Sequence, residues 1–380
     1  DKEAAIFYAL SLNATASAKD KTYANQKKAV QILEQILKEN PEHPGLYHYI
    51  IHNYDYPELA NLALPAARQY SKVAPAVPHA LHMPSHIFTR LGLWEDSVQS
   101  NLASEAAGEA LMKKTDPGAT HYDAVHAMDY LVYAYLQMDQ DQKAKQVLDQ
   151  IHDIKKVNVP SFSVGYAYAV SPARYAIERG DWKEAAKLTL LHEDFPWNKF
   201  SYGEANLYFA RALGEAKTGD LVSAKNDVKK LESIKQALID AKDPYWPDQI
   251  EIQRLSAAGW IAFAEGNKDE ALSLIQKAAD LEDSTEKHPV TPGPIIPARE
   301  QLGNLLLELN KPQEALEAYE KSLTKSPNRL NGLFGAAHAA ELSQNSEKAT
   351  RYYSQLIELT KNGDGNREEL KAAKKFLAAK

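Results

Sequence analysis

A small residue recurs along this chain at intervals of 34 residues or a little more, and this repeat constrains the possible folds more than any other feature. The intervals are 34, 34, 47, 41, 39, 47, 44 and 34 residues. A period of this size is the sequence signature of a repeat architecture, so the repeat is assigned before any single motif. The recurring positions are Ala29, Ala63, Ser97, Ala144, Ala185, Ala224, Ala271, Ala315 and Ala349.

The residues around each small position predict a pair of antiparallel helices. Ala29 is followed by Leu33, Ile36 and Pro41. Spacings of four and seven residues place side chains on one helix face, and the proline ends the helix. A glycine or asparagine precedes most of the small positions, as Gly219 precedes Ala224, and such a residue permits a tight turn between helices. We therefore predict an all-α fold of about nine helix pairs.

These residues resemble the tetratricopeptide repeat (TPR). The best match lies in residues 298–327, with Leu302-Gly303, Leu306, Ala315, Tyr319 and Pro327. The phrases HALHMPSHIF and HYIIHNYD are similar to those of a bacterial subgroup of TPR proteins. The resemblance implies a right-handed α-solenoid whose first helices line a concave groove, and it implies binding of a peptide or protein segment in that groove.

The repeats predict one continuous solenoid over residues 1–380 with internal regions of different character. We expect histidine-rich repeats at 1–156, further repeats at 157–361 and a capping helix at 362–380. Residues 157–172 are expected to join two units, so that Pro172 begins a first helix. Residues 287–297 read KHPVTPGPIIP, which cannot be helical and is too apolar for a mobile linker. We predict an ordered loop there, either as a spacer or as a flap over the groove.

Composition excludes several classes of function. The chain has no cysteine, which rules out disulfides, thiolate nucleophiles and zinc–thiolate sites. Its net charge is −7, with acidic and basic residues well mixed, so a basic surface for nucleic acid is not expected. No apolar run reaches 18 residues, which argues against membrane insertion. We expect a soluble protein of the bacterial periplasm or cytoplasm, and the sequence leaves the compartment open.

Histidine is concentrated in one part of the chain. Eight of the 12 histidines lie between His43 and His126. In the TPR frame, the second, fifth and ninth residues of a first helix face the groove. Three consecutive first helices should therefore direct imidazole or carboxylate groups at one another, from His48, His52, His79, His82, His86, His126 and Asp129.

Three interpretations of these residues remain open. Histidines four residues apart on a helix can bind one metal ion together, and a nitrogen-rich site without thiolate suits Zn, Cu, Ni or Fe. Asp55, and also His79, could then support the ligands from behind. Alternatively, the imidazoles line a metal-free binding groove, or they are packed structural groups. Since Pro84 interrupts the HMPSH phrase, His82 and His86 need not share one face.

Other groove positions are candidate peptide ligands. They are Tyr133, Arg174, Gln253, Trp260, Arg299 and Glu300. An arginine in the groove could hold a carboxylate through two parallel hydrogen bonds, or it could pair with an acidic residue of a neighbouring repeat. The favoured function is peptide binding in the groove. The alternative is a metal-binding protein, which could also be a metal-dependent enzyme.

Overall fold

The computed structural model describes residues 1–17 and 20–379, and it is 74% helical. Within these residues no β-strand occurs, and one isolated bridge joins Thr120 and Val157. No described helix is long and apolar enough to cross a membrane. The α-helices are α1 (Lys2–Ala14), α2 (Ala24–Glu39), α3 (Pro44–Tyr54), α4 (Ala60–Val73), α5 (Pro78–His82), α6 (Pro84–Arg90), α7 (Trp94–Thr115), α8 (Tyr122–Gln137), α9 (Asp141–Asp153), α10 (Phe162–Glu178), α11 (Trp182–Ala185), α12 (Ser201–Thr218), α13 (Leu221–Asp240), α14 (Trp246–Ala264), α15 (Lys268–Ser284), α16 (Ala298–Glu308), α17 (Pro312–Lys325), α18 (Leu330–Leu342), α19 (Ser346–Leu359) and α20 (Glu368–Ala378).

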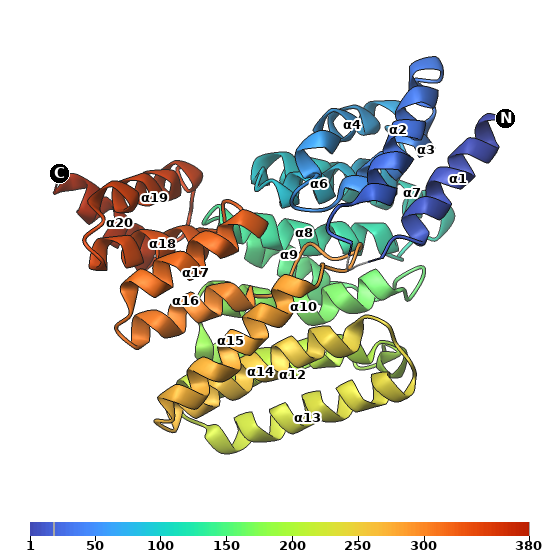
Figure 1. Ribbon diagram of the computed structural model, residues 1–380. Coiled ribbons are helices and arrows are strands. Elements are labelled where there is room, and N and C mark those ends of the chain that lie inside the picture. The colour runs from blue at the N-terminus through green and yellow to red at the C-terminus, as the bar shows by residue number, and fades with distance from the viewer. Residues whose placement is uncertain (18–19, 380) are drawn as a thin grey trace.

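Nine helix pairs and a final helix form a TPR-like solenoid in the described part of the chain, as the repeat predicted. The third pair consists of α5 and α6 against α7, and α20 packs on α19 (Figure 1). Every one of the nine small residues lies on the second helix of its pair and has no exposed surface. A larger side chain at these positions would push the paired helices apart. The small residue therefore recurs once in every helix pair, at the place where the two helices touch.

The turn within a pair requires a left-handed backbone at one residue. Gly219 has φ 92° and Asn310 has φ 56°, each at the end of a first helix. Glycine adopts this region without strain, and asparagine tolerates it better than most residues. Glycine serves a second purpose where helices meet closely. A side chain at Gly303 or Gly335 would collide with the ring of the buried Tyr319, so both positions must stay bare.

The fifth pair departs from the expected pattern. The helix α10 runs through Pro172 without ending, so the prediction that Pro172 begins a first helix is wrong. The proline removes one backbone donor, and the packed surroundings hold the helix on both sides of it. Its partner α11 has only four residues, after which the chain continues through a loop that contains the 3₁₀-helix η1 (Trp197–Lys199).

The C-terminal repeats return to the middle of the solenoid. In Figure 1 the red helices α18–α20 lie beside the green pair α8 and α9. The indole of Trp94 donates to the carbonyl of Asn328 at 2.7 Å, and the backbone N–H of Leu330 donates to Gln137 at 3.0 Å. Arg367 contacts Asp141 at 2.5 Å. These long-range contacts hold the superhelix in a closed form.

The proline-rich loop lies on the concave side of the first helices. Its carbonyl groups accept hydrogen bonds from Tyr130 of α8 and from Tyr166 and Arg174 of α10, at 3.1–3.2 Å. The side chains of Ile295 and Ile296 are buried. The loop therefore occupies space that an open TPR groove would leave for a peptide.

Candidate metal centre

Six imidazoles from three consecutive first helices form one continuous cluster. Neighbouring ring centroids are 4.3–6.4 Å apart. Among the described residues, the possible ligand atoms separate into two groups of three, each with all atoms within 4.8 Å of one another. We call His82, His86 and His126 the inner triad, and His48, His52 and His79 the outer triad.

The helices explain why these side chains meet. His48 and His52 are one turn apart on α3, and His126 lies on α8, which contacts α5. The interruption at Pro84 is present, since α5 ends at His82 and α6 begins at Pro84. Met83 nevertheless has helical dihedral angles, φ −52° and ψ −36°. His82 and His86 therefore remain one turn apart on the same side, and their Nε2 atoms are separated by 3.1 Å.

The inner triad is fully enclosed, whereas the outer triad opens towards solvent. His82 has no exposed surface, and His86 and His126 are 2% and 5% exposed. The side chain of His79 is 39% exposed. The outer triad thus connects solvent with the inner triad, because His52 lies beside His86 at a ring distance of 6.0 Å.

The partners of the inner triad fix which ring nitrogens carry protons. The Asn101 amide nitrogen donates to the carbonyl of Ser97 at 2.7 Å, so its Oδ1 faces His82 as an acceptor. The Nδ1–H of His82 donates to that oxygen at 2.6 Å. The Nδ1–H of His86 donates to the Asp55 carboxylate at 3.3 Å. Each neutral imidazole carries one proton, so both Nε2 atoms present lone pairs to each other.

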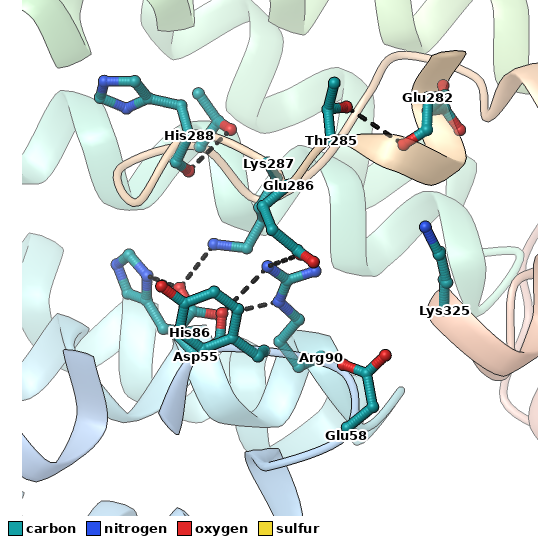
Figure 2. Close-up of polar contacts among 12 residues, drawn as sticks. Asp55, Glu58, His86, Arg90, Glu282, Thr285, Glu286, Lys287, His288 and Lys325 are labelled. Carbon is teal, nitrogen blue, oxygen red and sulfur yellow. Dashed lines mark hydrogen bonds and ion pairs between the residues drawn. The ribbon is translucent and has the colours of Figure 1, made fainter. Parts of the chain in front are cut away.

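Asp55 is held by two cations from distant parts of the chain. Its carboxylate accepts from Arg90 at 2.8 Å and from Lys287 at 2.6 Å (Figure 2). Burial alone would raise the pKa of Asp55, but these cations outweigh burial and hold the pKa below its usual range. Burial lowers the pKa of Lys287 to about 8, against the opposing effect of Asp55. The three groups are therefore charged at pH 7.

Five imidazoles of the cluster, those of His48, His52, His82, His86 and His126, are neutral near pH 7. Burial is the main cause, and neighbouring histidines add to it. The pKa of His82 and that of His48 are lowered to about 3, and the pKa of His52 to about 4. Those of His86 and His126 are also well below the ordinary value. Neutral imidazole is the form that donates a lone pair to a metal ion.

Asp129 does not lie with the imidazole ligand atoms, contrary to our expectation. Its carboxylate instead accepts a hydrogen bond from Arg174 at 2.6 Å, and both side chains are fully buried. The carboxylate nearest the inner triad is Asp55, at the position expected for an outer acceptor. Asp129 faces the next first helix, α10, because Arg174 on that helix supplies its cationic partner.

The candidate peptide ligands are mostly engaged within the protein. Tyr133 and Glu300 both contact the buried guanidinium of Arg329, at 2.8 Å and 3.0 Å. Arg299 pairs with Asp280 and Asp283 of α15, so it pairs with acidic residues as one of our alternatives supposed. Trp260 is buried and donates to Gln301, and Gln253 donates to Asn206. A peptide could reach these groups only after they exchange partners.

Several residues of the site escaped the sequence analysis. Tyr130 follows His126 by one helical turn and contacts His86, and the four-residue spacing was a usable signal. Asn101 lies on α7, a second helix, whereas the sequence analysis assigned groove-facing positions only on first helices. Lys287 and Arg329 lie far along the chain from their partners, and no local pattern marks them.

The comparisons with known proteins agree with the fold. Residues 296–329 match the model of the tetratricopeptide repeat. The chain therefore contains a tetratricopeptide repeat at residues 296–329, within a solenoid of TPR-like helix pairs. No curated protein sequence matched it.

Solved TPR structures resemble the chain only distantly. The P58(IPK) TPR domain is 16% identical, with 100% of this chain and 99% of that chain covered, at a TM-score of 0.28. The Cut9–Hcn1 hetero-tetramer of the APC/C is 14% identical. The similarity covers 99% of this chain and 62% of that chain, at a TM-score of 0.40. A tetratricopeptide-repeat protein from Parabacteroides merdae is 13% identical. The similarity covers 79% of this chain and 97% of that chain, at a TM-score of 0.37.

Proposed function

We propose that this protein binds a divalent transition metal ion through the inner triad. The observation that carries the proposal is the 3.1 Å separation between the Nε2 atoms of His82 and His86, whose Nδ1 protons are already committed to Asn101 and Asp55. Two lone pairs that face each other in a buried site repel unless a cation or a proton lies between them. Burial disfavours the protonated imidazole, which leaves a metal ion as the better partner.

The distances suit such an ion. Zinc–nitrogen bonds are about 2.0–2.1 Å, which places two tetrahedral ligands roughly 3.3–3.4 Å apart. His126 offers the third nitrogen within 4.8 Å of the other two. Asn101 and Asp55 hold the two rings from behind, as outer acceptors do in metal sites. Three protein ligands would leave a tetrahedral ion one position for water, which is the arrangement of a catalytic rather than a structural ion.

The donor set narrows the choice of metal. Imidazole nitrogen without thiolate favours Zn(II), Cu(II), Ni(II) and Fe(II), and affinity for such sites rises towards Cu(II). The test is isothermal titration of metal-free, tag-free protein with Zn(II) and Cu(II), repeated with His86→Ala. We expect the variant to bind the inner ion at least a hundredfold more weakly and to keep its helical content.

A matched control separates this site from ordinary surface histidines. His152 lies on α9, outside the cluster, and its side chain is 70% exposed. His152→Ala should bind metal as the wild type does. Equal metal affinity in the wild type, His86→Ala and His152→Ala would argue against the proposal.

Binding of a partner segment is a second candidate, favoured by a cavity whose lining contains no residue of the histidine cluster. This cavity of ≈ 480 Å³ is lined by Trp182, Lys217, Trp260, Glu300 and Phe334, among others. Its aromatic walls and mixed charge suit an anchoring side chain of a peptide. Two of its residues, Trp260 and Glu300, are among those expected from the TPR resemblance.

The partner candidate is tested by selecting peptides from a displayed random library on the wild-type protein. Peptides that use the cavity should bind at least tenfold more weakly to Lys217→Glu, which reverses the charge at the cavity. Lys187→Glu, an exposed residue outside the cavity, serves as the control. Equal binding of every selected peptide to both variants would count against this cavity.

A further inference from the structure

We infer that the outer triad holds a second divalent metal ion beside the first. This inference builds on the proposed function, because it turns the histidine cluster into a two-ion centre. It stands on separate residues, His48, His52 and His79, whose ligand atoms lie within 4.8 Å of one another. Small side-chain rotations close that distance to the roughly 3.3–3.4 Å of a bound ion.

The three outer ligands come from helices that fix their positions. His48 and His52 lie one turn apart on α3, with ring centroids 4.7 Å apart. His79, on the first turn of α5, stands 5.1 Å from His48. Two ligands four residues apart on one helix and a third from its neighbour form a three-nitrogen set that leaves one side of the ion open.

The outer triad also has polar groups behind its rings. The hydroxyl of Tyr70 is 3.4 Å from Nδ1 of His48. The carboxylate of Asp123, which is itself buried, is 3.5 Å from Nδ1 of His79. Acceptors in these places orient an imidazole and increase its basicity, as they do at metal sites generally. Asp123 and His126 both lie on α8, so one helix supports both triads.

One ion could not use all six imidazoles. The contacts that join the triads, from His52 to His86 and from His79 to His82, have ring distances of 6.0 and 6.4 Å. Within each triad one ligand atom from every histidine lies within 4.8 Å of the other two, although the rings of His86 and His126 are 6.3 Å apart. Two ions are the arrangement that satisfies both sets, and the outer ion would exchange with solvent more readily because His79 is exposed.

Metal stoichiometry tests the inference. Metal-free, tag-free protein is titrated with Cu(II), and bound copper is counted after gel filtration. We expect two equivalents in the wild type and one in His79→Ala. His126→Ala should also lose one equivalent, from the inner triad. His152→Ala should keep two, and circular dichroism verifies that each variant is folded.

A spectroscopic readout distinguishes the two sites without relying on a count alone. Two neighbouring Cu(II) ions couple magnetically, so the wild type should show less electron paramagnetic resonance intensity than its copper content predicts. Either single-site variant should show full intensity. One equivalent in the wild type that His79→Ala leaves in place would overturn the second site but keep the inner one. Loss of all binding in His126→Ala, with none lost in His79→Ala, would have the same meaning.

Discussion

The ammonium of Lys287 lies 2.6 Å from the carboxylate of Asp55, although 232 positions separate them in the chain. This contact ties the proline-rich loop to the histidine cluster, since Asp55 also accepts from His86. Both side chains are almost fully buried. The loop and the cluster therefore form one structural unit on the concave side of the solenoid.

Removing Lys287 should destabilise the protein and loosen the loop. Breaking a buried ion pair from one side costs about 3–5 kcal/mol, because the remaining charge is left buried and unpaired. Arg90 still contacts Asp55 in this variant. We therefore expect Lys287→Met to lower the free energy of unfolding in urea by about 3 kcal/mol, the lower end of that range. Hydrogen exchange in residues 287–297 should also become faster. Lys21→Met, at an exposed ion pair with Glu286, is the control. Unchanged stability and exchange would show that the contact does not hold the loop.

Stability should fall as the pH drops below about 6.5. The pKa values of His48, His52 and His82 are about 3–4 in the folded protein, below the ordinary histidine value of about 6.5 in the unfolded chain. Between these values the unfolded state binds more protons, so acid favours unfolding. Each such histidine adds a slope of about 1.4 kcal/mol per pH unit.

Thermal melts of the metal-free protein at pH 7.5, 6.5 and 5.5 test this pH dependence. We expect a modest loss between the first two values and a larger loss at pH 5.5. The loss should be smaller in His82→Gln, which removes one of the titrating groups. A melting temperature that is constant from pH 7.5 to 5.5 would mean that the imidazoles are not buried as the structure has them.

Arg329 should contribute far more to stability than a surface arginine. Its guanidinium contacts Glu300 and Glu178 at 3.0 and 2.7 Å, and all three side chains are buried. Arg329→Met leaves two buried carboxylates together, with an expected loss of about 3–5 kcal/mol. Arg68→Met breaks an exposed pair with Asp96 and should cost less than about 1 kcal/mol. Urea unfolding of the two variants measures the difference, and equal losses would contradict the assigned network.

Gly335 should not tolerate even a methyl group. Its Cβ would collide with the ring of Tyr319, which is 1% exposed and has no free space. Alanine usually stabilises a helix relative to glycine by about 1 kcal/mol, but overpacking costs about 1–3 kcal/mol. We expect Gly335→Ala to lower the melting temperature, and Tyr319→Leu in the same chain to recover part of that loss. Independent effects of the two substitutions would contradict direct contact.

The repeat made most of the fold predictable. The small residues from Ala29 to Ala349 are all buried between paired helices, because the geometry of one pair is set by residues only a few positions apart. The same local frame placed His48, His52, His82, His86 and His126 on facing helices.

The contacts that depend on superhelix curvature could not be predicted. Lys287 meets Asp55, and Arg329 meets Tyr133, because the later pairs of the solenoid turn back onto the earlier ones. Small rotations at each pair add up to this closure, and no local pattern in the sequence specifies their sum. Asp129 differs from expectation for another reason, because Arg174 of the adjacent first helix α10 supplies its hydrogen-bond donor.

The most direct test of the central claim is a thermal melt of metal-free, tag-free protein at pH 7.5 with and without Zn(II) or Cu(II). An ion that binds the native state stabilises it by about 2.7 kcal/mol at a hundredfold excess over the dissociation constant. We predict a higher melting temperature for the wild type and for His152→Ala, and a clearly smaller gain for His82→Ala or His86→Ala, which keep only the outer triad. If neither metal shifts the wild-type melt, the protein has no functional metal site and the histidine cluster is a structural feature of the solenoid.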